Sequence, residues 1–124
     1  MSFARQDRGR RSHARGLEAE TAACRALEQD GWAIRARRVR TPAGEADLIA
    51  EKDGLLAVIE VKARPVLADA AFALTPRQQA RLVAATDIIL SEHPDWGRNG
   101  VRFDLLVVDA AGSVRRIVDA FRGW

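Results

Sequence analysis

Cysteine is almost absent from this chain of 124 residues, in which Cys24 is the only one. A single cysteine excludes an intrachain disulfide and a zinc site built from cysteines. Long apolar stretches are missing too, so no segment is long enough to span a membrane, and the basic N-terminus lacks the apolar run of a signal peptide. These absences predict a cytoplasmic protein.

Lysine is also scarce, because only Lys52 and Lys62 are lysines among twenty basic residues. The chain uses arginine wherever a positive charge suffices. The two retained lysines are therefore candidates for roles that a compact ammonium performs better, such as contacting a water molecule. Lys52 lies beside an expected turn and is predicted to be solvated, which leaves Lys62 as a candidate functional residue. Two exceptions among twenty could equally arise by chance.

The positive charge is concentrated near the N-terminus. Residues 1–40 hold ten arginines against five acids, whereas the remainder holds ten bases against twelve acids. The first fifteen residues lack apolar periodicity and predict a flexible basic arm that contacts nucleic-acid phosphates, or alternatively a solubilising tail. Residues 16–124 are long enough for one domain with a real core. The arginines of the predicted arm are Arg5, Arg8, Arg10, Arg11 and Arg15.

An Asp-Gly dipeptide at positions 53–54 separates two apolar stretches and is a strong signal for a tight β-hairpin. If these two residues form the loop, counting back along both strands places Asp47 opposite Glu60 and Glu45 opposite Lys62. Side chains alternate between the two faces of a strand. The four polar residues should therefore share one face of the sheet.

Two acids placed opposite each other have Cβ atoms about 4.5 to 5.5 Å apart, and their charges repel. A cation between them would remove the repulsion. Mg²⁺ takes carboxylate oxygens at roughly 2.0 to 2.1 Å and keeps waters and substrate phosphates in its shell. The hairpin therefore predicts a divalent metal site at Asp47 and Glu60. The alternative is a solvated polar face, and the sequence leaves it open.

A first helix is expected from Gly16 to Asp30, because an alanine-rich segment ends at a glycine suited to a C-cap. Leu17, Cys24 and Leu27 recur at helical spacing, and Glu20 lies on the same stripe. A carboxylate on an apolar face must be paired, protonated or bound to a metal. Glu20 is therefore either a third acid of the site or a boundary residue that pairs with an arginine such as Arg64.

The rest of the chain predicts one more helix and three more strands. Thr75 is a suitable N-cap, Pro76 suits the first helical position, and Gln78 completes a capping box. Gln79 begins a stripe that faces the sheet, as a site residue or a boundary residue. The remaining expected elements are a strand over residues 32–39, a turn over 41–44, strands over 101–108 and 114–118, and a core closed by Phe121 and Trp124.

This order of elements, α-β-β-β-α-β-β, resembles the restriction-endonuclease-like core of the PD-(D/E)xK nuclease superfamily. The chain most resembles the YraN-like family of small bacterial proteins, which are similar in pattern to archaeal Holliday junction resolvases. Two positions depart from the pattern, since Gln78 stands where lysine is common and Ala46 where a larger aliphatic residue is usual. The matching residues are Gly16, Glu20, Ala23, Leu27 and Gly31; Gly44-Glu45 and Asp47-Leu48-Ile49; Glu60-Val61-Lys62 and Arg64; Gln79; Arg102-Phe103-Asp104; and Asp119-Ala120-Phe121.

The resemblance implies an α/β fold with a mixed central sheet of about five strands flanked by helices. It implies a metal-dependent endonuclease that hydrolyses phosphodiester bonds in DNA and recognises its shape. The catalytic set would be Glu20, Asp47, Glu60 and Lys62, with Gln79 in support. From the hairpin register, Glu45 is expected to position the ammonium of Lys62, and Arg64 is a further supporting residue. Mg²⁺ or Mn²⁺ would be bound by Asp47, Glu60, the backbone carbonyl of Val61 and Glu20, while Arg64 and the arm would hold the nucleic acid.

Two other classes of function stay open on sequence grounds. A nuclease fold can serve as a non-catalytic nucleic-acid-binding or scaffolding module, and it can also be a structural partner in a larger complex. One small domain with one site would need a second copy to cut two strands symmetrically. A junction resolvase would therefore be a homodimer, whereas a nickase needs one copy.

Overall fold

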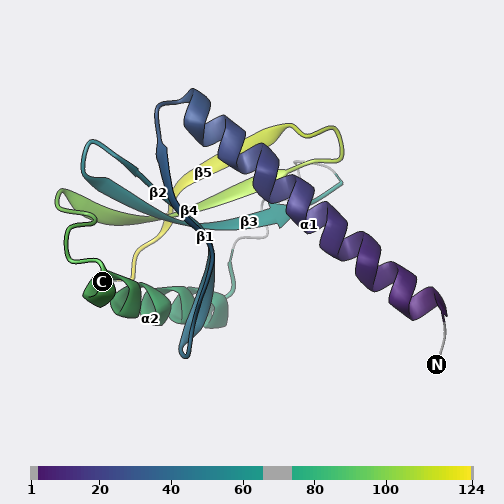
Figure 1. Ribbon diagram of the computed structural model, residues 1–124, viewed down its shortest axis with the longest axis horizontal. Coiled ribbons are helices and arrows are strands. Elements are labelled where there is room, and N and C mark those ends of the chain that lie inside the picture. Colours follow the sequence, from purple (N-terminus) through teal and green to yellow (C-terminus); the bar gives the residue numbers. More distant parts are fainter. Residues whose placement is uncertain (1–2, 66–73, 124) are drawn as a thin grey trace.

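A five-stranded sheet with a helix on each side forms the architecture of the computed structural model, which describes residues 3–65 and 74–123 and the side chains from Gly16 onward (Figure 1). The strands lie in the order β1-β2-β3-β4-β5. Only β3 and β4 are parallel, so the sheet is mixed. The predicted fold class and element order are confirmed. The elements are α1 (Phe3–Gln29), β1 (Ala33–Thr41), β2 (Gly44–Lys52), β3 (Leu55–Ala63), α2 (Pro76–Glu92), β4 (Gly100–Val108) and β5 (Val114–Phe121).

The sheet separates two apolar clusters, one under each helix. In the middle strand β3, Ala57 and Ile59 pack on the α1 side, whereas Leu56 and Val58 pack on the α2 side. A strand that is covered on both faces reads as a continuous apolar run, which explains the composition of β3 and β4. The stacked rings of Phe103 and Phe121, with centroids 4.6 Å apart, tie β5 to the α2 side. Trp124, also expected in the core, lies outside the described residues.

Helix α1 begins at Phe3, earlier than the start expected near Gly16. Its N-terminal half projects beyond the sheet, and Leu17, expected on the buried stripe, is 37% exposed (Figure 1). The helix ends as predicted at Gly31, whose φ is +85°. Trp32 N–H donates to the Leu27 carbonyl and Gly31 N–H to that of Glu28, which is the bonding pattern of a Schellman motif.

Helix α2 has the predicted start. The Thr75 side chain accepts from Gln78 N–H, and the Gln78 side chain accepts from Thr75 N–H, so the capping box is complete. The buried side of the helix carries Leu82, Ala85, Thr86 and Ile89 against the sheet. No helix within residues 3–65 and 74–123 combines the length and apolar character needed to cross a membrane.

The β2–β3 hairpin has the predicted two-residue turn. Asp53 and Gly54 have φ values of +53° and +80°, which is the left-handed pair that a type I′ turn requires. Lys52 pairs with Leu55, and the predicted register continues to Leu48 opposite Ile59. Lys52, expected to be solvated, is partly exposed, and its Nζ also donates to the Asp30 carbonyl at 2.6 Å at the end of α1. The scarcity of lysine is therefore not by itself a sign of a functional role.

Candidate active site

Strict alternation in β2 fails at Asp47. Leu48 and Ala50 pack on the α1 side, whereas Ala46 packs on the α2 side together with Ile49. In a regular strand, Ala46 would point to the same face as Leu48. The strand therefore changes face at Asp47, and residues before and after this point cannot be assigned to faces by counting.

The backbone pairing of β2 with β3 ends just before the two acids, at Leu48 and Ile59. Beyond this point a side-chain bond links the two strands, because Oδ2 of Asp47 accepts the backbone N–H of Val61 at 2.8 Å. The carboxyl groups of Asp47 and Glu60 lie within hydrogen-bonding reach of each other. The predicted meeting of these two acids is thus present, although side-chain bonding replaces the expected backbone register there.

Burial makes the charged forms of both acids unfavourable. Desolvation, followed by the negative charge of Asp47, raises the pKa of Glu60 to about 7. Desolvation also raises the pKa of Asp47, and Glu20 adds to this effect, while the hydrogen bond from Val61 opposes it. Near neutral pH the pair therefore shares a proton or needs a neighbouring cation.

Lys62 supplies one such cation. Its Nζ lies 3.7 Å from Oε1 of Glu60, and both side chains are about one-fifth exposed. The positive charge of Lys62 lowers the pKa of both Asp47 and Glu60, but by less than burial raises it. The ammonium therefore contacts the acid pair without neutralising it.

Glu20 approaches the pair from α1. It is 7% exposed, and its Oε2 accepts from Nε of Arg38 at 2.8 Å. Its charge contributes to the raised pKa of Asp47, so it belongs to the same electrostatic cluster. An arginine partner was one of the two alternatives expected for Glu20, with Arg64 as the example. The partner is Arg38, which has no sequence signal beyond being one of several arginines in β1.

Glu45 and Gln79, two of the expected supporting residues, bond other groups than the acids. Glu45 was expected to face Lys62, but it is exposed and lies 3.6 Å from Nε of Arg40. The change of face at Asp47 accounts for this difference. Gln79 is half-buried, and its side chain donates to the Leu74 carbonyl at 2.9 Å, at the entrance to α2. The side chains of the five N-terminal arginines lie outside the described residues.

A cavity of about 640 Å³ lies between α1 and the ends of β3 and β4. Its wall includes Arg64, which is half-buried and donates from Nη1 to the Ala63 carbonyl. Ala19 and Ala63, which also line it, are the direct chain neighbours of Glu20 and Lys62. The cavity therefore has an arginine in its wall, but the three acids and Lys62 are not among its described lining residues.

No group of three or more His, Cys, Asp or Glu side chains is arranged to hold a metal ion within residues 16–65 and 74–123. The two acids that do meet, Asp47 and Glu60, are hard oxygen donors held together against their mutual repulsion. Such a donor set fits a divalent cation of the Mg²⁺ type. The third acid, Glu20, is held by Arg38 in this arrangement.

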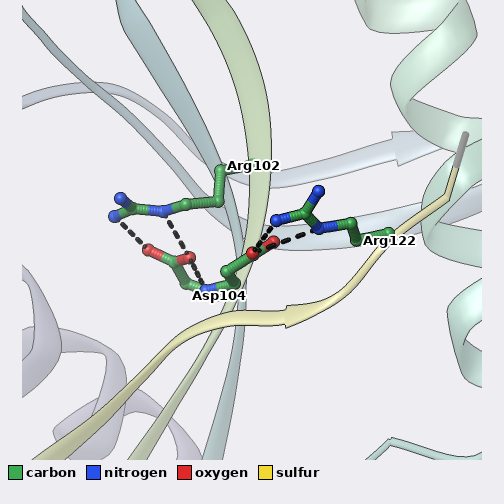
Figure 2. Close-up of polar contacts among 4 residues, drawn as sticks. Arg102, Asp104 and Arg122 are labelled. Carbon is green, nitrogen blue, oxygen red and sulfur yellow. Dashed lines mark hydrogen bonds and ion pairs between the residues drawn. The ribbon is translucent and has the colours of Figure 1, made fainter.

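A second buried acid, Asp104 in β4, was part of the family resemblance but was given no role. It is 1% exposed and binds Arg102 through two hydrogen bonds of 2.8 Å. Its Oδ1 also accepts the backbone N–H of Asp119 at 2.9 Å (Figure 2). An acid two residues after an arginine in a largely apolar strand was the available signal, and the partners show that Asp104 links β4 to β5.

The sequence is similar to a set of bacterial proteins of one family. A model of the uncharacterised protein family UPF0102 matches residues 19–108. A UPF0102 protein of Granulibacter bethesdensis is 59% identical over 94% of this chain and 77% of its own length. Two proteins from Rhodopseudomonas palustris strains are 46% and 49% identical, each over 86% of this chain and 82% of their own. With the family match covering most of the domain, the chain belongs to the UPF0102 family.

Proposed function

We propose that this protein is a metal-dependent nuclease with a restriction-endonuclease-like core that hydrolyses phosphodiester bonds in DNA. The observation that carries the proposal is the meeting of Asp47 and Glu60 where β2 and β3 stop pairing, with Lys62 3.7 Å from Glu60. Two facing acids can bind a divalent cation, and a neighbouring lysine can stabilise negative charge on a phosphate, so this arrangement suits phosphodiester hydrolysis. Mg²⁺ or Mn²⁺ is the proposed cofactor.

Asp47 and Glu60 would hold the cation, with the backbone carbonyl of Val61 beside them. The raised pKa values of both acids support this role. Burial and mutual repulsion make their negative charges unfavourable, and a bound cation would relieve both effects. When bound, the cation lowers the pKa of a coordinated water and stabilises charge on the phosphate. Asp47 has a second task, since its bond to Val61 N–H fixes the backbone of β3 at the site.

Lys62 would orient the attacking water and stabilise the negative charge that develops on the phosphate. Its position next to Glu60 places an ammonium at the edge of the acid pair, where a phosphate oxygen would lie. A lysine suits this task because its ammonium is a compact point charge with rotatable donors. Glu20 would join the cation directly or through water.

The cavity between α1 and the ends of β3 and β4 is the proposed path of the nucleic-acid strand. Arg64 in its wall would contact a backbone phosphate. Such contacts supply affinity without sequence information, so the expected preference is for structure, such as branched DNA, over sequence. The N-terminal arginines are proposed to extend this grip.

The deciding experiment is a cleavage assay on single-stranded, duplex and branched DNA and on RNA, with Mg²⁺ or Mn²⁺. Lys62→Ala should abolish cleavage, because it removes the ammonium next to Glu60. Lys52→Ala is the matched control, since it removes the only other lysine, whose Nζ binds the end of α1. Wild-type protein and the Lys52 variant should cleave alike.

Two results would reject catalysis. If no substrate is cut, or if Lys62→Ala cuts as well as the wild type, the fold serves as a nucleic-acid-binding or scaffolding module. Gel filtration of the same samples with and without branched DNA tests the homodimer that symmetric cutting of two strands would need.

A further inference from the structure

Arg38 has an unusual backbone conformation for its place in a strand. Its φ is +51°, in the left-handed region that few residues other than glycine adopt. Its neighbours Arg37 and Val39 pair with Leu48 and Ala46 of β2, so Arg38 lies across from Asp47. Residues with such strained backbones cluster at functional sites, where surrounding contacts hold them.

The contact that holds Arg38 is the ion pair with Glu20. Nε of Arg38 donates to Glu20 Oε2 at 2.8 Å, and the two side chains are 40% and 10% exposed. The acid of this pair is therefore buried, whereas the arginine still reaches the surface. A guanidinium carries a fork of N–H donors that matches a phosphate, and Nε alone is used for Glu20.

Glu20 is attracted by Arg38 and repelled by Asp47. It is bound to Arg38, and its negative charge already acts on the Asp47 carboxyl group. A divalent cation held by Asp47 and Glu60 would add positive charge, which attracts the negative Glu20 and repels the positive Arg38. The cation would thus weaken the ion pair from both sides.

We propose that Arg38, poised between Glu20 and the surface opposite Asp47, is a phosphate-binding residue that divalent-cation binding releases from Glu20. The proposal rests on the proposed function, since it takes a nucleic-acid phosphate as the ligand and the Asp47–Glu60 pair as the cation site. Its consequence is a positive coupling, in which the cation strengthens nucleic-acid binding and nucleic acid strengthens cation binding by the same factor.

The test measures duplex and branched DNA binding by fluorescence anisotropy at constant ionic strength, with and without Ca²⁺ as the divalent probe. Ca²⁺ should tighten DNA binding by the wild type about tenfold, within the usual range of such couplings. Arg38→Asn should lose most of this gain. Asparagine accepts a left-handed backbone, so this variant removes the guanidinium while allowing the fold of β1. Arg37→Asn is the matched control, because it removes the neighbouring charge from the same strand and should keep the gain.

A second readout separates release from simple positioning of Glu20. By calorimetry without DNA, Arg38→Asn should bind Mn²⁺ several-fold more tightly, because Glu20 no longer has to leave an arginine. In the Glu20→Gln variant, adding Arg38→Asn should change the Mn²⁺ affinity less than Arg38→Asn does in the wild type. Weaker Mn²⁺ binding by Arg38→Asn would overturn the proposal and make Arg38 a positioning residue for Glu20.

The outcomes also separate this inference from the nuclease proposal. A coupling that is lost in Arg38→Asn, in a protein that cuts no substrate, supports the inference and rejects catalysis. Cleavage by the wild type together with equal Ca²⁺ effects in Arg38→Asn and Arg37→Asn overturns the inference and leaves catalysis in place. An absence of any Ca²⁺ effect on DNA binding by the wild type also overturns it.

Discussion

Two groups of acids in the same sheet contrast sharply in how their charge is balanced. Asp104 in β4 has a bidentate arginine and a backbone N–H, and its side chain has no exposure. Asp47 in β2 meets another acid, Glu60, and the nearest ammonium lies 3.7 Å from Glu60. The first arrangement satisfies a buried charge, and the second leaves charge unbalanced. The contrast separates a group that holds the fold from the proposed cation site.

Removing the balanced acid should have the largest effect on stability. Asp104→Ala leaves Arg102 without its partner and the Asp119 N–H without an acceptor. Breaking a buried ion pair in this way costs about 3 to 5 kcal/mol. Urea unfolding should show a loss of this size, whereas Arg122→Ala, in an exposed pair with Asp119, should change the free energy by less than about 0.5 kcal/mol. A loss below about 1 kcal/mol for Asp104→Ala would remove the contrast.

Neutralising one acid of the Asp47–Glu60 pair should increase the stability of the protein instead of lowering it. Glu60→Gln removes the repulsion with Asp47, so at pH 8 without metal the variant should be more stable than the wild type by about 2 kcal/mol. The figure allows for the partial exposure of Glu60. Urea unfolding in the presence of a chelator measures it. A less stable variant would mean that Glu60 is satisfied in the same way as Asp104.

The same repulsion predicts a pH dependence. The pKa of Glu60 is raised to about 7 in the folded protein from an ordinary value of 4.5, so the folded state binds the proton more tightly than the unfolded state. Stability of the metal-free protein should therefore fall as pH rises through the window from 4.5 to 7, by about 1 kcal/mol between pH 6 and pH 8. Glu60→Gln should lack this slope, and a wild type whose stability rises over that interval would contradict the assignment.

The smallest effect is expected at Glu45, which sequence counting placed beside Lys62. Its exposed pair with Arg40 is worth less than about 0.5 kcal/mol, so Glu45→Gln should barely change stability. It should also leave any Mn²⁺-induced rise in melting temperature intact. A smaller Mn²⁺-induced rise in melting temperature in this variant would show that Glu45 contributes to cation binding.

The sequence predicted those features that depend on local rules. The type I′ turn at residues 53–54, the capping box at Thr75 and the C-cap at Gly31 each follow from the conformational preferences of a few adjacent residues. The register of β2 and β3 followed from the turn as far as Leu48 and Ile59. The meeting of Asp47 and Glu60 followed from that register, because the two acids come directly after its last pair.

Features that depend on irregular backbone or distant packing were not predictable. No glycine or proline marks the change of face at Asp47 or the left-handed backbone of Arg38. Regular alternation along β2 therefore predicted the wrong partner for Glu45. The ion pair between Glu20 and Arg38 joins a helix to an edge strand with several arginines, and the choice among them depends on the fold. Leu17 is exposed although helical spacing predicted its burial, because spacing does not show how much of a helix the sheet covers.

If the proposed cation site is real, Asp47 and Glu60 are held together at the expense of stability. Thermal unfolding of the wild type and Asp47→Asn at pH 8, with a chelator and then with Mn²⁺, separates this cost from the effect of the cation. An asparagine side-chain oxygen can still accept the Val61 N–H, so the variant removes charge while preserving that bond. The variant should melt higher than the wild type in chelator and lower in Mn²⁺. A variant that melts lower in chelator, with no effect of Mn²⁺ on either protein, would rule out a cation site at these two acids.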